Sequence, residues 1–141
     1  MTHALALYDR ALAGDAARVN FDDGSEFPLP VRRYLGPIDA ADERMLAGVQ
    51  GPVLDVGCGP GRHLRALSRR GVFALGVDIS EQAVRLACRD GARAVVADVF
   101  GELPGSWQTA LLLDGNIGIG GDPVRLLRRL AQLLHPTGVV L

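Results

Sequence analysis

The stretch VLDVGCGPGR at residues 53–62 most constrains what this chain can fold into. Glycines stand at positions 57, 59 and 61, directly after a short apolar run that carries one carboxylate, Asp55. A glycine loop between a strand and a helix lets a ligand approach the backbone closely, and the helix N-terminus offers free N–H groups. The stretch therefore predicts the first strand, loop and helix of an α/β ligand-binding domain.

Apolar runs alternate with helical patterns from residue 51 onward. The predicted strands are 52–57, 73–80, 93–100, 109–115 and one that begins at Gly138. The predicted helices are 61–71, 80–91 and 122–138. Several strands are apolar on both faces, as in a parallel sheet that helices cover on each side. The fold class we predict is α/β, a doubly wound and mostly parallel sheet with helices on both faces.

Residues 1–50 follow a different pattern. Residues 2–14 have an amphipathic helical period, residues 20–37 are rich in turn formers and are predicted to be irregular, and residues 38–49 form a second short helix. We expect this segment to lie across the carboxyl edge of the sheet as a helical lid. Residues 51–141 then form the ligand-binding domain.

Composition supports one domain and argues against several function classes. With 141 residues, 48% of them hydrophobic, the chain can bury a core of its own. Fifteen arginines, with no lysine, oppose 16 acidic residues, so no net field attracts nucleic acid or an anionic membrane. Cys58 and Cys88 lack metal-ligand spacing, and neither a signal peptide nor a membrane span is evident. We expect a cytoplasmic protein without a metal.

Three details of the sequence narrow the class of ligand that the loop can bind. The glycine pattern is G-x-G-x-G rather than G-x-G-x-x-G, Asp55 precedes it, and Asp78 closes the next strand. An acidic side chain at the end of the second strand can accept hydrogen bonds from both hydroxyls of a ribose. The third strand ends in Asp98 and Val99, next to where a purine edge would lie. The pattern indicates an adenosine-containing ligand.

The motifs VLDVGCGPGRH, GVDIS, ADVF, LLLDGN and LLHPTGVVL, spread over residues 51–141, resemble the successive motifs of class I S-adenosylmethionine-dependent methyltransferases. The resemblance implies the strand order 3-2-1-4-5, with S-adenosyl-L-methionine as cofactor and S-adenosyl-L-homocysteine as product. It also implies transfer of a methyl group. The acceptor is expected to be a small molecule rather than nucleic acid or protein, and its identity stays open.

The resemblance also implies a role for each motif residue. The glycine loop and Asp55 border the methionine part of the cofactor, Asp78 binds the ribose, and Ile79 lies against the adenine. Asp98 accepts from the adenine amino group, and the Val99 N–H donates to a ring nitrogen. The residues after the fourth strand lie near the sulfonium. The predicted cofactor-binding residues are Asp55, Gly57, Cys58, Gly59, Gly61, Asp78, Ile79, Asp98, Val99, Asp114, Gly115 and Asn116.

Several residues keep two interpretations. Asp78 also fits an N-cap for the helix that begins near Ser80, and Asp98 also fits an ordinary turn aspartate. His63 and Asp114 are the candidates for a general base, although the sequence shows no orienting partner for either. Arg33, with Arg32 and Tyr34, either reaches over the methionine carboxylate or lies on a solvated surface.

Two other functions compete with methyl transfer. The family pattern continues past the fifth strand, whereas this sequence stops at Leu141, so an adenosylmethionine-binding module without turnover is the main alternative. The strand that begins at Gly138 is then expected as a sheet edge that pairs with another chain or frays, which makes a homo-oligomer possible. A nicotinamide oxidoreductase ranks lower, because Arg62 replaces the last fingerprint glycine and Pro60 interrupts the loop.

Overall fold

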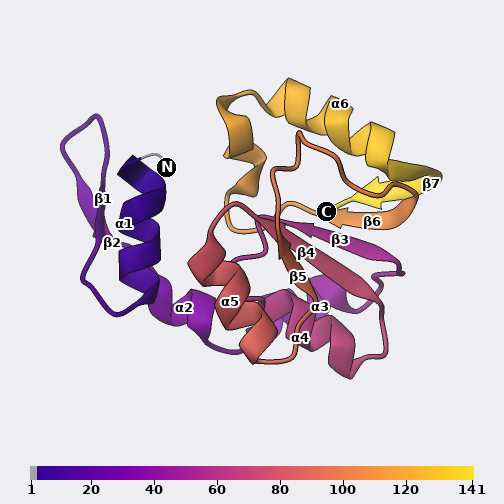
Figure 1. Ribbon diagram of the computed structural model, residues 1–141, viewed down its shortest axis with the longest axis horizontal. Helices are drawn as coiled ribbons and strands as arrows, with labels where there is room; N and C mark the ends of the chain where they lie inside the picture. The colour runs from indigo at the N-terminus through magenta and orange to yellow at the C-terminus, as the bar shows by residue number, and fades with distance from the viewer. Residues whose placement is uncertain (1–2) are drawn as a thin grey trace.

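A five-stranded parallel sheet lies at the centre of the computed structural model, which describes residues 3–141 (Figure 1). Its strands are β3 (Val53–Val56), β4 (Ala74–Asp78), β5 (Ala94–Val96), β6 (Trp107–Leu111) and β7 (Leu134–Val140). Their spatial order is β5-β4-β3-β6-β7, and every neighbouring pair is parallel. Counted along the chain from β3, this is the predicted order 3-2-1-4-5, which is therefore confirmed.

Helices cover both faces of the sheet, as predicted. The helices on one face are α3 (Ala40–Leu46), α4 (Arg62–Arg69) and α5 (Glu81–Arg89), and α6 (Pro123–Leu133) covers the other (Figure 1). Neighbouring residues of β3 point to opposite faces. Val53 packs with Leu64 and Leu67 of α4, while Leu54 packs with the core that contains Leu126 of α6.

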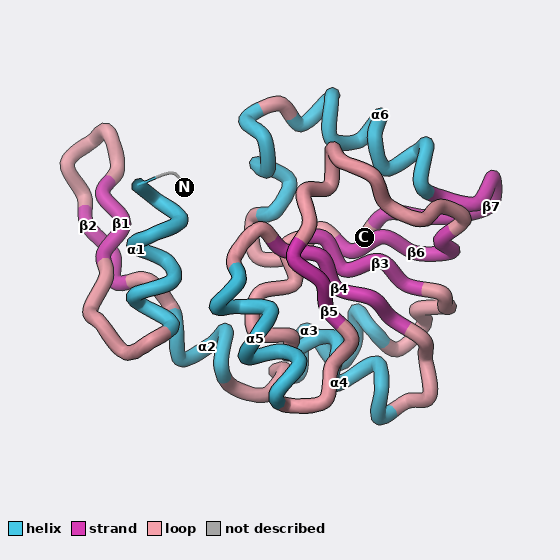
Figure 2. Tube along the Cα trace, viewed as in Figure 1, coloured by secondary structure: helices cyan, strands magenta, loops and turns pink. Residues whose placement is uncertain are grey.

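The N-terminal segment is more regular than its sequence indicates. The elements here are α1 (His3–Leu12), β1 (Arg18–Asn20), β2 (Glu26–Pro28) and α2 (Val31–Leu35). The predicted helices near both ends of the segment are present, although Thr2 lies outside the described residues. The prediction that residues 20–37 are irregular is wrong, because Gly24 and Asp23 close an antiparallel β1-β2 hairpin. Figure 2 shows that hairpin beside α1 and away from the central sheet.

The predicted boundary between the last helix and the last strand is also wrong. Helix α6 ends at Leu133, and β7 begins at Leu134 instead of Gly138. Pro136 explains the early end, because a proline disfavours the helical conformation of the residue before it and donates no N–H. Strand β7 is the outermost strand of the sheet, and Val139 is 49% exposed. Pairing of this edge with another chain stays a prediction. Within residues 3–141, no helix combines the length and the apolar character needed to cross a membrane.

Gly76 of β4 sets how closely the glycine loop and α4 approach the sheet. A Cβ at this position would lie 2.5 Å from the Cys58 Sγ and 2.5 Å from the Leu64 Cδ1. We expect Gly76→Ala to lower the free energy of unfolding by about 1–3 kcal/mol, measured by urea denaturation, because the core there is already full. Gly48→Ala is the matched control, since a Cβ at Gly48 meets no atom within 4 Å. Equal stability of the two variants would show that the loop can move away.

Candidate functional site

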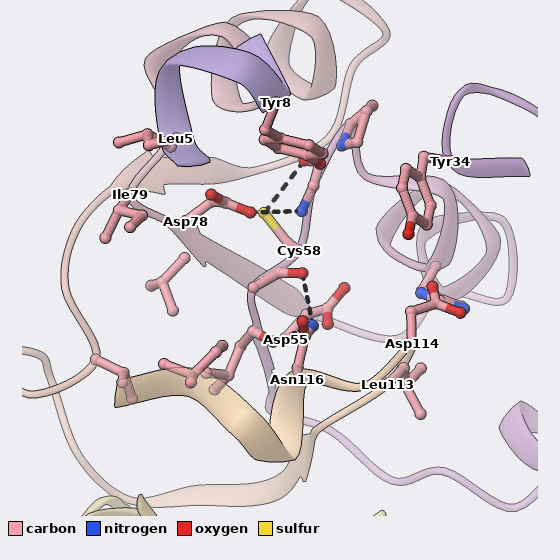
Figure 3. A pocket seen from close by; sticks show the side chains of 18 of the residues that line it. Leu5, Tyr8, Tyr34, Asp55, Cys58, Asp78, Ile79, Leu113, Asp114 and Asn116 are labelled. Atoms are coloured by element: carbon pink, nitrogen blue, oxygen red, sulfur yellow. Dashed lines mark hydrogen bonds between the residues drawn. The ribbon is translucent and has the colours of Figure 1, made fainter. Parts of the chain in front are cut away.

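A cavity of about 380 Å³ lies at the carboxyl ends of β3, β4, β5 and β6. The chain runs outward from β3 through β4 to β5 and then crosses to β6 on the other side of β3. Ligands of open α/β sheets bind at such a switch point. Residues of α1 and α2, among them Tyr8 and Tyr34, complete the wall opposite the strand ends (Figure 3).

The glycine loop forms the floor of this cavity, and its backbone requires glycine. Gly57, Gly59 and Gly61 have φ angles of 71°, 53° and 83°, which side chains disfavour. A Cβ on Gly57 would lie 2.6 Å from the Asn116 Nδ2, and one on Gly61 would lie 2.9 Å from the Ala87 Cβ. Gly57 and Gly59 thus hold the bare backbone of the loop against the ligand space, whereas Gly61 does not line the cavity.

Asp55 is a buried carboxyl group at the end of β3, beside the cavity (Figure 3). The residue is 1% exposed, and its Oδ2 has no hydrogen-bond partner among the described residues. Burial raises the pKa of Asp55 to about 7, and the nearby carboxylates of Asp78 and Asp114 add to the shift. A cation beside this oxygen would supply the missing partner.

Asp78 ends β4 and links the two loops that border the cavity. Its Oδ2 accepts the Gly59 N–H at 2.8 Å, and its Oδ1 accepts the Ser80 N–H at 2.9 Å. Burial raises the pKa of Asp78, although these two bonds act to lower it. An ionised carboxylate has about four acceptor positions, so two stay open for a ligand. Ile79, which is 55% exposed, lines the cavity next to it.

The loop after β5 brings a carboxylate and a backbone amide to the same wall. Asp98 and Val99 both line the cavity; Asp98 is exposed and Val99 is buried. The Asp98 Oδ1 accepts the Phe100 N–H at 2.9 Å, which closes the turn and leaves the other carboxylate oxygen available. The structural interpretation of Asp98 as a turn aspartate is therefore correct and does not exclude a contact with a ligand.

The loop after β6 is tied to the glycine loop by two side chains. The Asn116 Nδ2 donates to the Val56 and Gly57 carbonyls at 2.8 and 2.9 Å. The Arg62 Nη2 donates to both Asp114 oxygens at 3.0 and 2.8 Å, and Asp114 has a φ of 53°. Asp114 and Asn116 line the cavity, whereas Gly115 does not. The predicted contacts of these three residues with the cofactor stay predictions.

An ionic network with a buried centre lies beside this loop, and sequence reasoning missed that centre. Arg62, only 4% exposed, bonds Asp42 of α3 as well as Asp114. Arg33 of α2 donates to Asp39 at 3.0 Å and comes within 3.6 Å of Asp114. Arg33 is exposed, as the interpretation of a solvated surface residue expects, and it joins the edge of this network through Asp39. The only sequence signal was an arginine in place of the expected last glycine of the loop.

The two candidates for a general base now have partners. The His63 Nε2 lies 3.4 Å from the Asp42 Oδ1, and His63 lines the cavity while being 4% exposed. Burial lowers the pKa of His63, and the neighbouring Arg62 lowers it further. Asp114 is held by Arg62 through both oxygens. Asp42 is thus an orienting group for His63 that the sequence did not reveal.

Helix α1 brings Tyr8 over the cavity. The Asp9 carboxylate accepts a hydrogen bond from the Ser80 hydroxyl, which fastens α1 to the start of α5. Tyr8 lies edge-on to Tyr34 with ring centroids 6.3 Å apart, and burial raises its pKa with a further contribution from Asp78. A Cβ on Gly59 would lie 3.2 Å from the Tyr8 hydroxyl, so Tyr8 closes over the glycine loop. Sequence reasoning expected a lid in this region but did not name Tyr8.

Cys58 is a small residue packed inside the glycine loop. It is buried, and its Sγ lies in the space that a side chain at Gly76 would otherwise fill. Burial, with Asp55 nearby, raises the pKa of its thiol, so the reactive thiolate is disfavoured. Within residues 3–141, no group of three or more His, Cys, Asp or Glu side chains is placed to hold a metal ion.

A family model described as a methyltransferase domain matches residues 53–138, from the start of β3 into β7. The parallel sheet, the glycine loop and the carboxylates at the strand ends define the fold of class I S-adenosylmethionine-dependent methyltransferases. The chain belongs to the methyltransferase domain family.

The proteins similar to this chain include methyltransferases that are named for ubiquinone biosynthesis or for a sugar. The ubiquinone biosynthesis O-methyltransferase of Xanthomonas euvesicatoria is 31% identical over 128 residues, which cover 82% of this chain and 51% of the relative. A methyltransferase from Bacteroides fragilis, solved with S-adenosyl-L-homocysteine, matches with a TM-score of 0.82 and 28% identity over 96% of this chain and 61% of that one. A sugar N-methyltransferase from Streptoalloteichus matches with a TM-score of 0.58 and 28% identity over 71% and 42%. The chain spans about half the length of the curated relatives it matches.

Proposed function

We propose that the chain binds S-adenosyl-L-methionine at the cavity and transfers its methyl group to a small-molecule acceptor. The observation that carries this proposal is Asp55, a fully buried carboxyl group with an unpartnered oxygen beside a cavity at the switch point of the sheet. S-adenosylmethionine carries an ammonium and a sulfonium against one carboxylate. A pocket with this acidic floor suits such a ligand better than it suits a pyrophosphate.

The remaining contacts follow the strand ends. Asp78 has two acceptor positions left for the ribose hydroxyls, and Ile79 offers an apolar surface to the adenine. Asp98 and Val99 offer an acceptor and a donor to the purine edge. The methionine end then lies along the glycine loop, between Asp55 and the residues after β6. In this arrangement the methyl group faces the wall that α1 and α2 complete.

Methyl transfer needs little covalent help from the protein. A lone pair of the acceptor forms the new bond to the methyl carbon while the sulfur–carbon bond breaks, its electron pair returns to sulfur, and the acceptor loses a proton. Positioning the two reactants and excluding water supply most of the rate. We assign the proton-accepting role to His63 rather than Asp114, because His63 stays neutral near pH 7 while Asp114 is engaged by Arg62.

A small acceptor is supported by the wall of the cavity. The side chains there that the cofactor assignment leaves unused are mostly apolar or aromatic, and they include Leu5, Leu29, Tyr34 and Leu113. Relatives named for ubiquinone biosynthesis and for a sugar point in the same direction. Among the described residues that line the cavity, Arg62 is the one arginine, and Asp42 and Asp114 engage it, so the lining offers no free basic group to a nucleic acid.

Calorimetric titration tests the proposal. The chain is expected to bind S-adenosylhomocysteine at one site and not to bind NADH, which separates a methyltransferase from a nicotinamide enzyme. Transfer of a labelled methyl group is then measured against a panel of phenols and amines. Binding without transfer would favour the alternative of a binding module, and a folded chain that binds no S-adenosylhomocysteine would refute the proposal.

A further inference from the structure

The loop that offers Asp98 and Val99 to the cavity is held from its outer side by one arginine of α6. The Arg129 Nε donates to the Val99 carbonyl at 2.9 Å, and its Nη2 donates to the Gly101 carbonyl at 2.6 Å. A planar guanidinium that bonds two carbonyls fixes their relative orientation. Helix α6 is itself rigidly placed, because Leu126 and Leu130 are fully buried on either side of Arg129 in the sequence.

Phe100 fastens the same loop from a second direction. The Arg125 guanidinium lies over its ring, 4.1 Å from the centroid. A Cβ on Gly120 would lie 2.6 Å from the Phe100 Cε2, so the 3-10 helix η1 (Asn116–Gly121) packs against the ring as well. Arg128, next to Arg129, is exposed and takes no part in these contacts.

The inner side of this loop presents one acceptor beside one donor. Asp98 keeps a carboxylate oxygen free, and the Val99 N–H has no acceptor among residues 3–141. Adenine offers the complementary pair, an amino group that donates and a ring nitrogen that accepts. A 6-oxopurine offers the reverse at both positions, a carbonyl oxygen and a ring N–H. Two adjacent groups of fixed orientation can therefore separate the two bases.

We infer that Arg129 is a positioning residue, which holds the Asp98 and Val99 groups in the orientation that selects adenine over a 6-oxopurine. The inference rests on the proposed function, because that proposal places the adenine at this loop. Arg129 touches neither ligand nor reacting atoms; it acts through the Val99 and Gly101 carbonyls. Its loss frees the Val99–Phe100 and Gly101–Glu102 peptides, whose carbonyls it bonds, and so loosens the turn that presents Asp98 and the Val99 N–H. We expect this to weaken the preference for one base more than it weakens binding of the rest of the cofactor.

The experiment compares two ligands in four proteins. Affinities for S-adenosylhomocysteine and for S-inosylhomocysteine, in which a carbonyl replaces the adenine amino group, are measured by calorimetry. The wild-type chain is expected to prefer the adenosyl ligand. Arg129→Met is expected to reduce this preference about tenfold or more. Arg129→Lys is expected to reduce the preference in the same way, because one ammonium group does not reproduce the planar, forked guanidinium. Arg128→Met is the matched control and should keep the wild-type ratio.

Each outcome decides the inference. Equal weakening of both ligands by the Arg129 variants, with an unchanged ratio, would show a structural role alone and overturn it. If the wild type binds both ligands equally, this loop does not discriminate between the two bases, and the inference is wrong. The proposed function is not contradicted by that result. If the wild type binds neither, the proposed function fails and the inference falls with it. Should Arg129→Met not fold by circular dichroism, the Arg129→Lys ratio decides.

Discussion

Replacing Asp78 by alanine is expected to weaken the binding of S-adenosylhomocysteine by at least about a hundredfold. In the proposed complex the carboxylate accepts hydrogen bonds from both ribose hydroxyls, and each charge-assisted bond contributes about 1.5–3 kcal/mol. Two such bonds correspond to a factor of about a hundred or more in the dissociation constant. The substitution also releases the Gly59 N–H, so the glycine loop loses the bond that holds it toward β4.

Calorimetry with matched variants separates these two contributions. Asp78→Asn keeps an acceptor oxygen for the loop and removes the charge, so we expect its affinity to fall between those of the wild type and Asp78→Ala. Asp22→Ala, in the turn between β1 and β2, changes the net charge by the same amount away from the cavity and should bind like the wild type. Unchanged affinity in a folded Asp78→Ala variant would show that the ribose does not lie at β4.

The central sheet could be predicted because its signals are local. β3, β4 and β5 are short, mainly apolar runs, and the glycine loop with Asp55 marks the first of them, so the resemblance to a known family supplied the strand order. The hairpin β1-β2 carries no such signal: every residue of both strands is exposed, and no alternation of burial distinguishes them from a loop. Its two strands are held together by backbone hydrogen bonds and by the contact of Phe21 with Phe27. Both depend on how the strands pair in space, which no periodic pattern in the sequence indicates.

The residues of the site also divide into those with a local sequence signal and those without one. Asp55, Asp78 and Asp98 stand at strand ends, where the parallel sheet brings them to one edge without further information. The ionic network could not be found that way, because Arg62 is separated from Asp42 by 20 positions and from Asp114 by 52. Each of these residues taken alone resembles a surface charge. Only the fold shows that α3, α4 and the loop after β6 meet there and bury Arg62 and Asp42.

Asp55 is expected to make the free protein less stable as the pH rises from about 4 to about 7. In the unfolded chain its carboxyl group loses its proton near pH 3.9, whereas in the folded chain burial keeps the pKa at about 7. Between these values the folded state binds the extra proton, so the free energy of unfolding falls with rising pH. The full shift corresponds to about 4 kcal/mol, and the fall ends once the pH exceeds the folded pKa.

Urea denaturation of the wild type and Asp55→Asn across this range isolates the effect. His63, whose pKa is lowered, acts in the opposite direction, but it is common to both proteins and cancels in their difference. Asparagine resembles the protonated carboxyl group and does not titrate, so the stability of the wild type relative to Asp55→Asn should fall from pH 4 to 7. A difference that does not vary with pH would show that Asp55 ionises normally.

We expect the same carboxyl group to link cofactor binding to proton release. The ammonium of the ligand, placed beside the unpartnered Oδ2, favours the ionised form and lowers the pKa of Asp55. Binding of S-adenosylhomocysteine near pH 6 should therefore release close to one proton in the wild type and much less in Asp55→Asn. Calorimetric enthalpies in two buffers of different ionisation enthalpy measure that number. Equal proton release by both proteins would place the ammonium away from Asp55, whatever the affinity.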